Sequence, residues 1–541
     1  AASDVYKRQG RADMFVNSFI NGTDWKNEVT AIDRMAKLTK EDIVAFANKY
    51  LKEDNYAVIY KKQGKDPNEK KMTKPEITPI ITNRDVTSPF LVEVQESAVK
   101  PIEPVFLDYQ KDMSQLKAKS DIPVLYKQNV ANDLFQLIYV FDMGNNHDKA
   151  LGTAFDYLEY LGTSDMTPEE LKSEFYRLAC TFYVSPGNER TYVVLSGLNE
   201  NMPAAVQLFE KLLADAQVNK EAYTNMTSDI LKARSDAKLN QGQNFSRLMS
   251  FAMYGPKSPA TNLLTEAELT NMNPQELVDR IHNQNSYKHR ILYYGPSSSK
   301  DLLATINQYH QVPAALKDIP AGNEYSYLET PVTKVLVAPY DAKQIYMAQI
   351  SNLDKKYDPA IEPIRALYDE YFGGGMNSIV FQEMRETRGL AYSAWASIMP
   401  PSYLKYPYVL RTQIATQNDK MIDAVTTFND IINNMPESEA AFKLAKDGLT
   451  NRLRTERIIK GDIIWSYINA QDLGQNVDPR IKLYNDIQNM SLKDIVDFQK
   501  QWVKGRTYVY CILGDKKDLE LDKLKAVGPI EELTQEQIFG Y

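Results

Sequence analysis

Two residues of this chain have side chains and a spacing that could bind a polypeptide backbone. They are Arg385 and Tyr392, which lie seven positions apart. A guanidinium and a phenol both donate hydrogen bonds, so together they can grip a backbone carbonyl without help from a partner side chain. The chemistry that this pair indicates is the holding of a main chain.

The elements that must position this pair are indicated by residues 373–395, GGGMNSIVFQEMRETRGLAYSAW. The glycines release a short helix, because Phe381, Met384 and Arg388 recur at helical spacing. Gly389 ends that helix, and a strand is predicted from position 391. The arginine would then lie on the last helical turn and the tyrosine at the start of the strand, both on rigid elements.

The alternative interpretation is purely structural. Arg385 would be a surface arginine paired with Glu386 or Glu383, and Tyr392 would fill a strand core, since structural ion pairs are common. The glycines at 373–375 could cradle a phosphate, but the sequence holds no G-x-x-x-x-G-K-[ST]. A helix C-cap followed by a turn is the simpler interpretation of these glycines.

Histidines and cysteines form no recognisable catalytic or metal-binding pattern. His282 and His289, even on one unbroken helix, would lie about 10 Å apart along its axis, too far to share one zinc ion. We expect them to be ordinary surface or strand-end residues. Cys180 and Cys511 cannot make a disulfide framework and are expected to be small buried residues rather than nucleophiles. The full set of histidines is His147, His282, His289 and His310.

Length and charge exclude several classes of protein. A chain of 541 residues is too long for one core, so about two to four domains are expected. The net charge of −8 argues against a nucleic-acid partner, because a nucleic-acid-binding face is basic. No apolar run approaches the roughly 18 residues that a membrane helix needs, so no membrane span is predicted.

One helix–strand pattern occurs three times. Each copy has a capping residue and an acid three positions later, then an amphipathic helix and a short strand. The copies start 234 and 218 residues apart, which is domain-sized repetition rather than a solenoid. The capping residues are Thr39, Asn273 and Ser491, and the predicted strands are residues 56–60, 290–294 and 508–513.

The segments between these copies also agree with one another. From residue 135, and again from residue 344, the chain reads strand, two helices, two strands and a helix. This order predicts an α+β protein of repeated two-layer domains, each with a mixed or antiparallel sheet and helices packed on one face.

The expected domain organisation has five segments. Residues 1–9 would be a non-native scar, 10–62 the C-terminal remnant of an upstream α+β domain, and 63–100 a proline-rich linker between halves. Residues 101–320 and 321–541 would be complete domains of one fold.

Residues 373–395 resemble the C-terminal-half motif of the insulinase/pitrilysin zinc peptidases, the inverzincins. The likeness rests on the glycine break, Phe-Gln-Glu-x-Arg and Gly-Leu-Ala-Tyr, and the repeated domains extend it over nearly the whole chain. In that family four similar domains form two bowl-like halves that close around a peptide. The resemblance implies that Arg385 and Tyr392 contact the substrate backbone and that domain 101–320 is a non-catalytic copy.

The same resemblance implies a zinc ion, which this chain is not expected to hold. The family's metal site is H-x-x-E-H on a helix of the first domain plus a later glutamate, and zinc-bound water is the nucleophile. The matching helix here has Asp156 and Tyr160 at the histidine positions, and Glu159 alone cannot hold zinc. We therefore expect no catalytic residue, metal ligand or cofactor on this chain, and zinc only in the full-length protein.

The leading hypothesis is the substrate-binding C-terminal half of a zinc-dependent metalloendopeptidase that hydrolyses peptides or unfolded polypeptides and is inactive without its upstream zinc domain. The alternative is a natural non-catalytic partner or scaffold subunit of a zinc-bearing peptidase subunit. An upstream reading frame containing H-x-x-E-H would favour the first, and a start codon near Met14 the second. The expected partners are a peptide substrate and the zinc-bearing half or subunit. The composition favours a bacterial periplasm or cell envelope over the cytoplasm.

Overall fold

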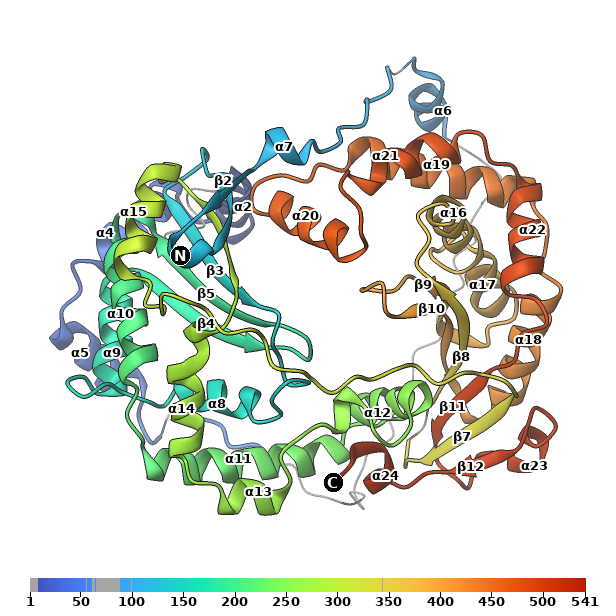
Figure 1. The fold of residues 1–541 in the computed structure, drawn as a ribbon. Helices are drawn as coiled ribbons and strands as arrows, with labels where there is room; N and C mark the ends of the chain where they lie inside the picture. Colours follow the sequence, from blue (N-terminus) through green and yellow to red (C-terminus); the bar gives the residue numbers. More distant parts are fainter. Residues whose placement is uncertain (1–7, 55, 61–63, 65–87, 99, 343) are drawn as a thin grey trace. The chain divides into compact units, whose positions relative to one another are not determined.

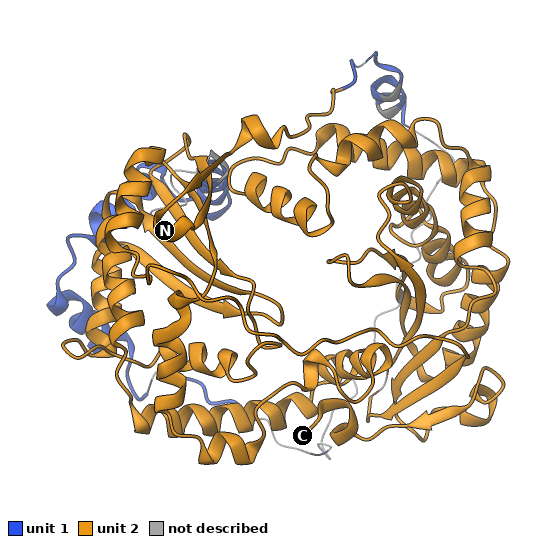
Figure 2. Cartoon of the chain, viewed as in Figure 1, with its two compact units in different colours: residues 1–101 blue, residues 102–541 orange. Residues whose placement is uncertain are grey.

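The computed structural model of the chain describes every residue except 1–7, 55, 61–63, 65–87, 99 and 343. It divides into two compact units, residues 1–101 and 102–541 (Figure 2). No described helix is both long enough and apolar enough to cross a membrane.

Unit 1 is helical, and its described residues form no sheet. Helix α5 begins with the predicted capping box: the Asp42 backbone N–H donates to Thr39 Oγ1 at 3.2 Å, and the Thr39 N–H donates to Asp42 Oδ2 at 2.9 Å. The helices are α2 (Arg8–Asn21), α3 (Trp25–Val29), α4 (Ala31–Met35), α5 (Lys40–Tyr50) and α6 (Pro89–Glu96).

Two predictions for unit 1 are wrong. Residues 56–60 form no strand, because a strand is held by hydrogen bonds to neighbouring strands and the described part of unit 1 offers none. Helix α6 lies inside the segment expected to be an extended linker. The rest of residues 63–100 falls largely outside the described part of the chain.

Unit 2 contains two six-stranded mixed sheets with the same strand order (Figure 1). The first sheet runs β1-β2-β6-β3-β5-β4, and β2 is parallel to β6 while β3 is antiparallel to both β5 and β6. Its strands are β1 (Ser114–Lys117), β2 (Pro123–Gln128), β3 (Leu134–Phe141), β4 (Cys180–Pro186), β5 (Thr191–Leu198) and β6 (Arg290–Gly295).

The second sheet runs β12-β7-β11-β8-β10-β9. Here β7 is parallel to β11, and β8 is antiparallel to both β10 and β11, so β6 and β11 occupy equivalent central positions. The α+β repeat predicted from the sequence is thus confirmed as one strand order used twice. The strands are β7 (Lys334–Pro339), β8 (Gln344–Lys356), β9 (Ala391–Met399), β10 (Pro407–Gln417), β11 (Val509–Gly514) and β12 (Ile530–Glu532).

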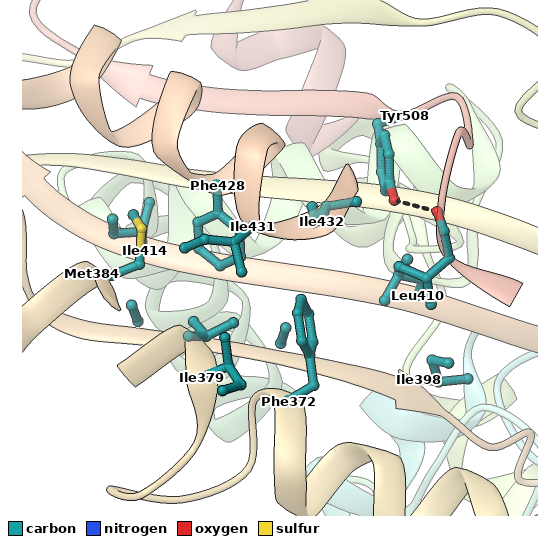
Figure 3. Close-up of a cluster of buried hydrophobic side chains, with 14 of the residues drawn as sticks. Phe372, Ile379, Met384, Ile398, Leu410, Ile414, Phe428, Ile431, Ile432 and Tyr508 are labelled. Atoms are coloured by element: carbon teal, nitrogen blue, oxygen red, sulfur yellow. Dashed lines mark hydrogen bonds between the residues drawn. The ribbon is translucent and has the colours of Figure 1, made fainter. Parts of the chain in front are cut away.

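A helical layer covers one face of each sheet. In the second, Phe372, Met384 and Phe428 are buried against strand residues such as Leu410 (Figure 3). The helices preceding the second sheet's first strand are α7 (Tyr109–Asp112), α8 (Leu151–Leu158), α9 (Pro168–Arg177), α10 (Met202–Asp215), α11 (Lys220–Lys238), α12 (Gln241–Tyr254), α13 (Glu266–Asn271), α14 (Gln275–Asn283) and α15 (Ser299–Tyr309). Those following it are α16 (Glu362–Phe372), α17 (Ile379–Phe381), α18 (Met421–Asn433), α19 (Glu439–Thr455), α20 (Asp462–Asp472), α21 (Pro479–Ile487), α22 (Leu492–Trp502), α23 (Leu521–Leu524) and α24 (Gln535–Phe539).

The opposite face of each sheet receives a helix from the other half of unit 2. Phe245 and Leu248 of α12 pack on β7, β8 and β11, and Ile463 and Ile464 of α20 pack on the first sheet. Arg190 reinforces this exchange, because its guanidinium contacts both carboxylate oxygens of Asp472 at 2.6 Å. The sequence did not predict this exchange.

The second and third helix–strand copies form as predicted, with one correction. Ser491 and Asp494 make the expected capping box, but Asn273 and Glu276 do not. Helix α14 begins at Gln275 with Pro274 at the N-cap position, and Asn273 Oδ1 accepts from the Gln275 N–H instead.

Candidate functional site

The segment that carries Arg385 is a short, irregular helix. It begins at α17 and continues as a π-helix, residues 382–387, before Gly389 turns the chain with φ of +56°. A π-helix adds one residue per hydrogen-bonded turn and is frequent at functional sites. The predicted helix, its glycine end and the strand from Ala391 are all present.

Arg385 is held at the surface by contacts within this helix. Its side chain is 36% exposed, its Nε lies 3.5 Å from Glu386 Oε1, and its guanidinium stacks 4.9 Å from the Phe381 ring centroid. The neighbouring Met384 is fully buried among the α18 side chains, so the backbone under the arginine is anchored (Figure 3). The ion pair named in the structural alternative therefore exists, but at a distance where it contributes little.

Tyr392 is the second residue of β9, an edge strand of its sheet. The register with β10 shifts here, because Ala391 pairs with Thr416 while Ser393 pairs with Ala415, so the tyrosine backbone forms a β-bulge. Bulges at sheet edges re-aim side chains and are frequent near binding sites. The tyrosine side chain itself lies outside what the structure describes.

Gly373 explains the glycine break. It is the C-cap residue of α16, as the C-cap interpretation required, but with φ of −141°. A β-carbon at this position would lie 2.1 Å from the Ala396 carbonyl oxygen of β9. The glycine is therefore needed for close approach of a helix to the strand that carries Tyr392, and not for a left-handed turn.

We expect Gly373→Ala to destabilise the protein by about 1–3 kcal/mol, because the clash is with backbone that cannot rotate away. The measurement is chemical denaturation followed by circular dichroism. Gly448→Ala is the matched control: this exposed glycine in α19 has open space around it, and alanine there should stabilise the protein by about 0.5–1 kcal/mol. Equal effects of both substitutions would refute the packing argument.

The residues at the place of the family's zinc helix do not fit a metal ion. In α8 and the turn after it, Asp156, Glu159 and Tyr160 are exposed, while Tyr157 is buried and its hydroxyl donates to the Asn219 carbonyl oxygen at 2.6 Å. Among the described residues, no three His, Cys, Asp or Glu side chains gather as a metal site would require. No catalytic step through zinc can be derived for this chain.

The interpretation of His289 as a strand-end residue is confirmed, because it directly precedes β6, but it is not a surface residue, because its side chain is buried. Its Nε2 lies 2.8 Å from Nε2 of His310, whose Nδ1 lies 2.6 Å from Glu210 Oε1, and all three side chains are buried. The Glu210 carboxylate also accepts from Asn285 Nδ2 and the Gln311 N–H. A series of hydrogen-bonded, buried polar side chains thus lies beneath the first sheet.

The cysteine predictions are confirmed. Cys180 and Cys511 are both free and buried. Burial raises the pKa of the Cys180 thiol to about 11 and that of Cys511 to about 12, so neither carries a ready thiolate.

Comparison with known proteins relates this arrangement to a family. Residues 291–449 match the family model described as the peptidase M16 inactive domain. Residues 291–449 are thus similar to an M16 peptidase domain. M16 is the insulinase/pitrilysin group that the sequence motif resembles, and the α+β fold of the chain agrees with this match.

The proteins that this chain resembles differ in length and in name. The non-peptidase homolog YmxG of Helicobacter pylori is 23% identical over 422 residues, which cover 74% of this chain and 93% of that protein. A peptidase M16 inactive domain from Pseudomonas fluorescens matches with a TM-score of 0.59 and 15% identity, over 75% of this chain and 98% of that one. The periplasmic protease PqqL of Escherichia coli matches with a TM-score of 0.60 and 12% identity, over 90% of this chain but only 52% of PqqL.

Proposed function

We propose that this chain is the substrate-binding C-terminal half of a zinc-dependent metalloendopeptidase that acts on peptides or unfolded polypeptides. It holds substrate through Arg385 and Tyr392, and a zinc-bearing half supplies the nucleophile. The chain spans about half the length of PqqL, which is the proportion that a half would have.

The proposal of a second half rests on the exposed apolar side chains of the first helix–strand copy. Counted from their capping residues, Ile43 corresponds to Ile495 and Tyr60 to Ile512. Ile43 is 58% exposed and Tyr60 is 80% exposed, whereas their counterparts in unit 2 are both fully buried at 0%. Two positions that are buried around β11 are thus uncovered within unit 1.

Burying this copy requires a sheet with a vacant central position. In unit 2 the equivalent strands β6 and β11 each lie between a parallel and an antiparallel neighbour, and both positions are filled. We propose that residues 10–62 are the end of a further α+β domain, with residues 63–100 joining it to the domains 101–320 and 321–541. Residues 1–9 would be foreign to that domain.

Substrate contact by Arg385 is supported by its surroundings. It is partly exposed on an anchored helical turn, and the strand that follows starts with a bulge at an open sheet edge. A cation and a phenol placed on two such elements can orient a carbonyl without moving themselves, and precise orientation is a large part of catalysis.

In the complete zinc-containing protein, Arg385→Ala and Tyr392→Phe should each lower kcat/KM by at least about ten-fold, since positioning contacts contribute that much or more. Zinc content, measured by mass spectrometry of the metal, should not change. Arg388→Ala is the matched control, because Arg388 lies three residues away and pairs with Glu383. Peptide hydrolysis that is insensitive to the first two substitutions would refute the assigned role.

A second candidate function is that of a non-catalytic partner of a zinc-bearing peptidase subunit. It is favoured by YmxG, which bears the name of a non-peptidase homolog and is covered over 93% of its length. The test is to mix this chain with a zinc-bearing polypeptide that a separate gene encodes. Peptide cleavage that requires both polypeptides would decide for this alternative.

For localisation we propose the bacterial periplasm or cell envelope. The support is that PqqL is described as a periplasmic protease. Fractionation of the source cells with a periplasmic marker enzyme is the measurement.

A further inference from the structure

The uncovered half of the second sheet carries an arginine over an indole. Alternate residues of β10 face α12's side of the sheet, as the pairing of Arg411 with Ile350 and of Gln413 with Ala348 shows. Trp395 of β9 pairs with Gln413 and lies on the same face. The Arg411 guanidinium stacks 5.1 Å from the Trp395 ring centroid, and its Nη2 donates to Gln413 Oε1 at 2.6 Å.

Helix α12 does not cover this part of the sheet. The apolar cluster that it forms takes Leu336, Ala348 and Cys511 from β7, β8 and β11, and only Val409 from β10. On the same face of β9, Ser393 is exposed and Trp395 is half-buried. The wall formed by Trp395, Arg411 and Gln413, which we call the indole wall, is therefore accessible, and Trp395 lies on β9, the strand that carries Tyr392.

The charge of the indole wall is not balanced by the protein. Within the described residues, no carboxylate lies within ion-pair distance of Arg411, and burial lowers its pKa. Arg190 and Arg365, which are also largely buried, each contact two carboxylates. A partly desolvated cation without a counter-charge costs free energy that an anionic ligand recovers.

We infer that the indole wall binds acidic segments of the polypeptide that this half holds. A substrate carboxylate accepts hydrogen bonds from the Arg411 guanidinium, and an adjacent apolar side chain of the substrate packs on the Trp395 indole. The inference rests on the proposed function and adds a substrate preference to it: extended chains with acidic residues over neutral ones.

The test is equilibrium binding of two fluorescein-labelled extended peptides that differ only in a central Glu-Glu or Gln-Gln pair. Fluorescence anisotropy with the whole chain should show about ten-fold tighter binding of the acidic peptide, the value of one charge-assisted pair. Arg411→Gln should abolish that preference, Arg411→Lys should keep part of it, and Trp395→Leu should weaken both peptides alike.

Arg452→Gln is the matched control, because this exposed arginine pairs with Glu370 on the outer helical layer. Circular dichroism verifies that each variant folds, and in the wild type the acidic preference should fall with added salt. Equal binding of both peptides by the wild type would overturn the inference while leaving substrate holding intact. Binding of neither peptide would overturn both the acidic preference and the proposed holding of substrate. If the acidic preference is present but Arg385→Ala leaves kcat/KM of the complete protein unchanged, only the role of Arg385 is overturned.

Discussion

Glu210→Ala should destabilise unit 2 by about 3–5 kcal/mol, the cost of removing one member of a buried charged network. The Glu210 side chain is 1% exposed and accepts from the His310 ring, from Asn285 Nδ2 and from the Gln311 N–H. Alanine would leave these three donors buried with no acceptor, and each unsatisfied donor is costly. Urea denaturation followed by circular dichroism measures the effect.

Two further variants distinguish the stability lost by breaking the buried network from the stability lost by removing any carboxylate. Glu174→Ala removes an exposed carboxylate that pairs with Arg177 on α9, and the free energy of unfolding should hardly change. Glu210→Gln retains an acceptor oxygen and should fall between wild type and alanine. If Glu210→Ala unfolds at the same urea concentration as Glu174→Ala, the network does not stabilise the fold.

The regular elements could be predicted because their signals are local. The helical spacing of Phe381 and Met384 and the glycine at 389 correctly located the helix before β9. The strand predicted over residues 56–60 failed, because strand formation depends on partners that a local pattern does not contain. The domain boundary drawn at residue 320 stays a prediction.

Side-chain sites that join distant segments could not be predicted. His310 and Glu210 lie 100 residues apart in the sequence, and neither has a neighbour that marks it as buried. The π-helical form of residues 382–387, with Met384 buried in the core formed by distant segments, is likewise not marked by a local pattern. For the indole wall a signal existed in the sequence: Arg411 and Gln413 lie two positions apart between Leu410 and Ile414, a spacing that places both polar side chains on one face of a strand.

Stability should also fall on acidification through His289. Its Nδ1 lies 2.7 Å from the Tyr287 carbonyl oxygen and must donate to it, so the neutral ring offers Nε2 as the acceptor for the His310 N–H. The other groups that face this ring pair are Glu210 from α10, Asn285, and Tyr139 and Phe141 from β3. A proton added to His289 would set two N–H groups against each other.

The sign of the pH dependence follows from this geometry. Burial and the neighbouring His310 ring lower the pKa of His289 to about 3, whereas an unfolded histidine titrates near 6.5. Between these values the unfolded chain binds more protons than the folded one, so the stabilisation is complete above about pH 6.5 and is lost as the pH falls toward 3. The loss at pH 5 relative to pH 7.5 should be about 2 kcal/mol.

Urea denaturation at these two pH values should show that loss in the wild type and a smaller one in His289→Gln, whose amide can donate and accept but does not titrate. His282→Gln serves as the control. His282 lies on α14, its imidazole is exposed, and its Nε2 contacts the Ala216 carbonyl oxygen. A wild type and a His289→Gln variant that lose the same stability on acidification would show that the buried ring pair does not govern the response. Because carboxylates elsewhere also titrate below pH 5, the difference between the two variants, and not the wild-type curve alone, isolates His289.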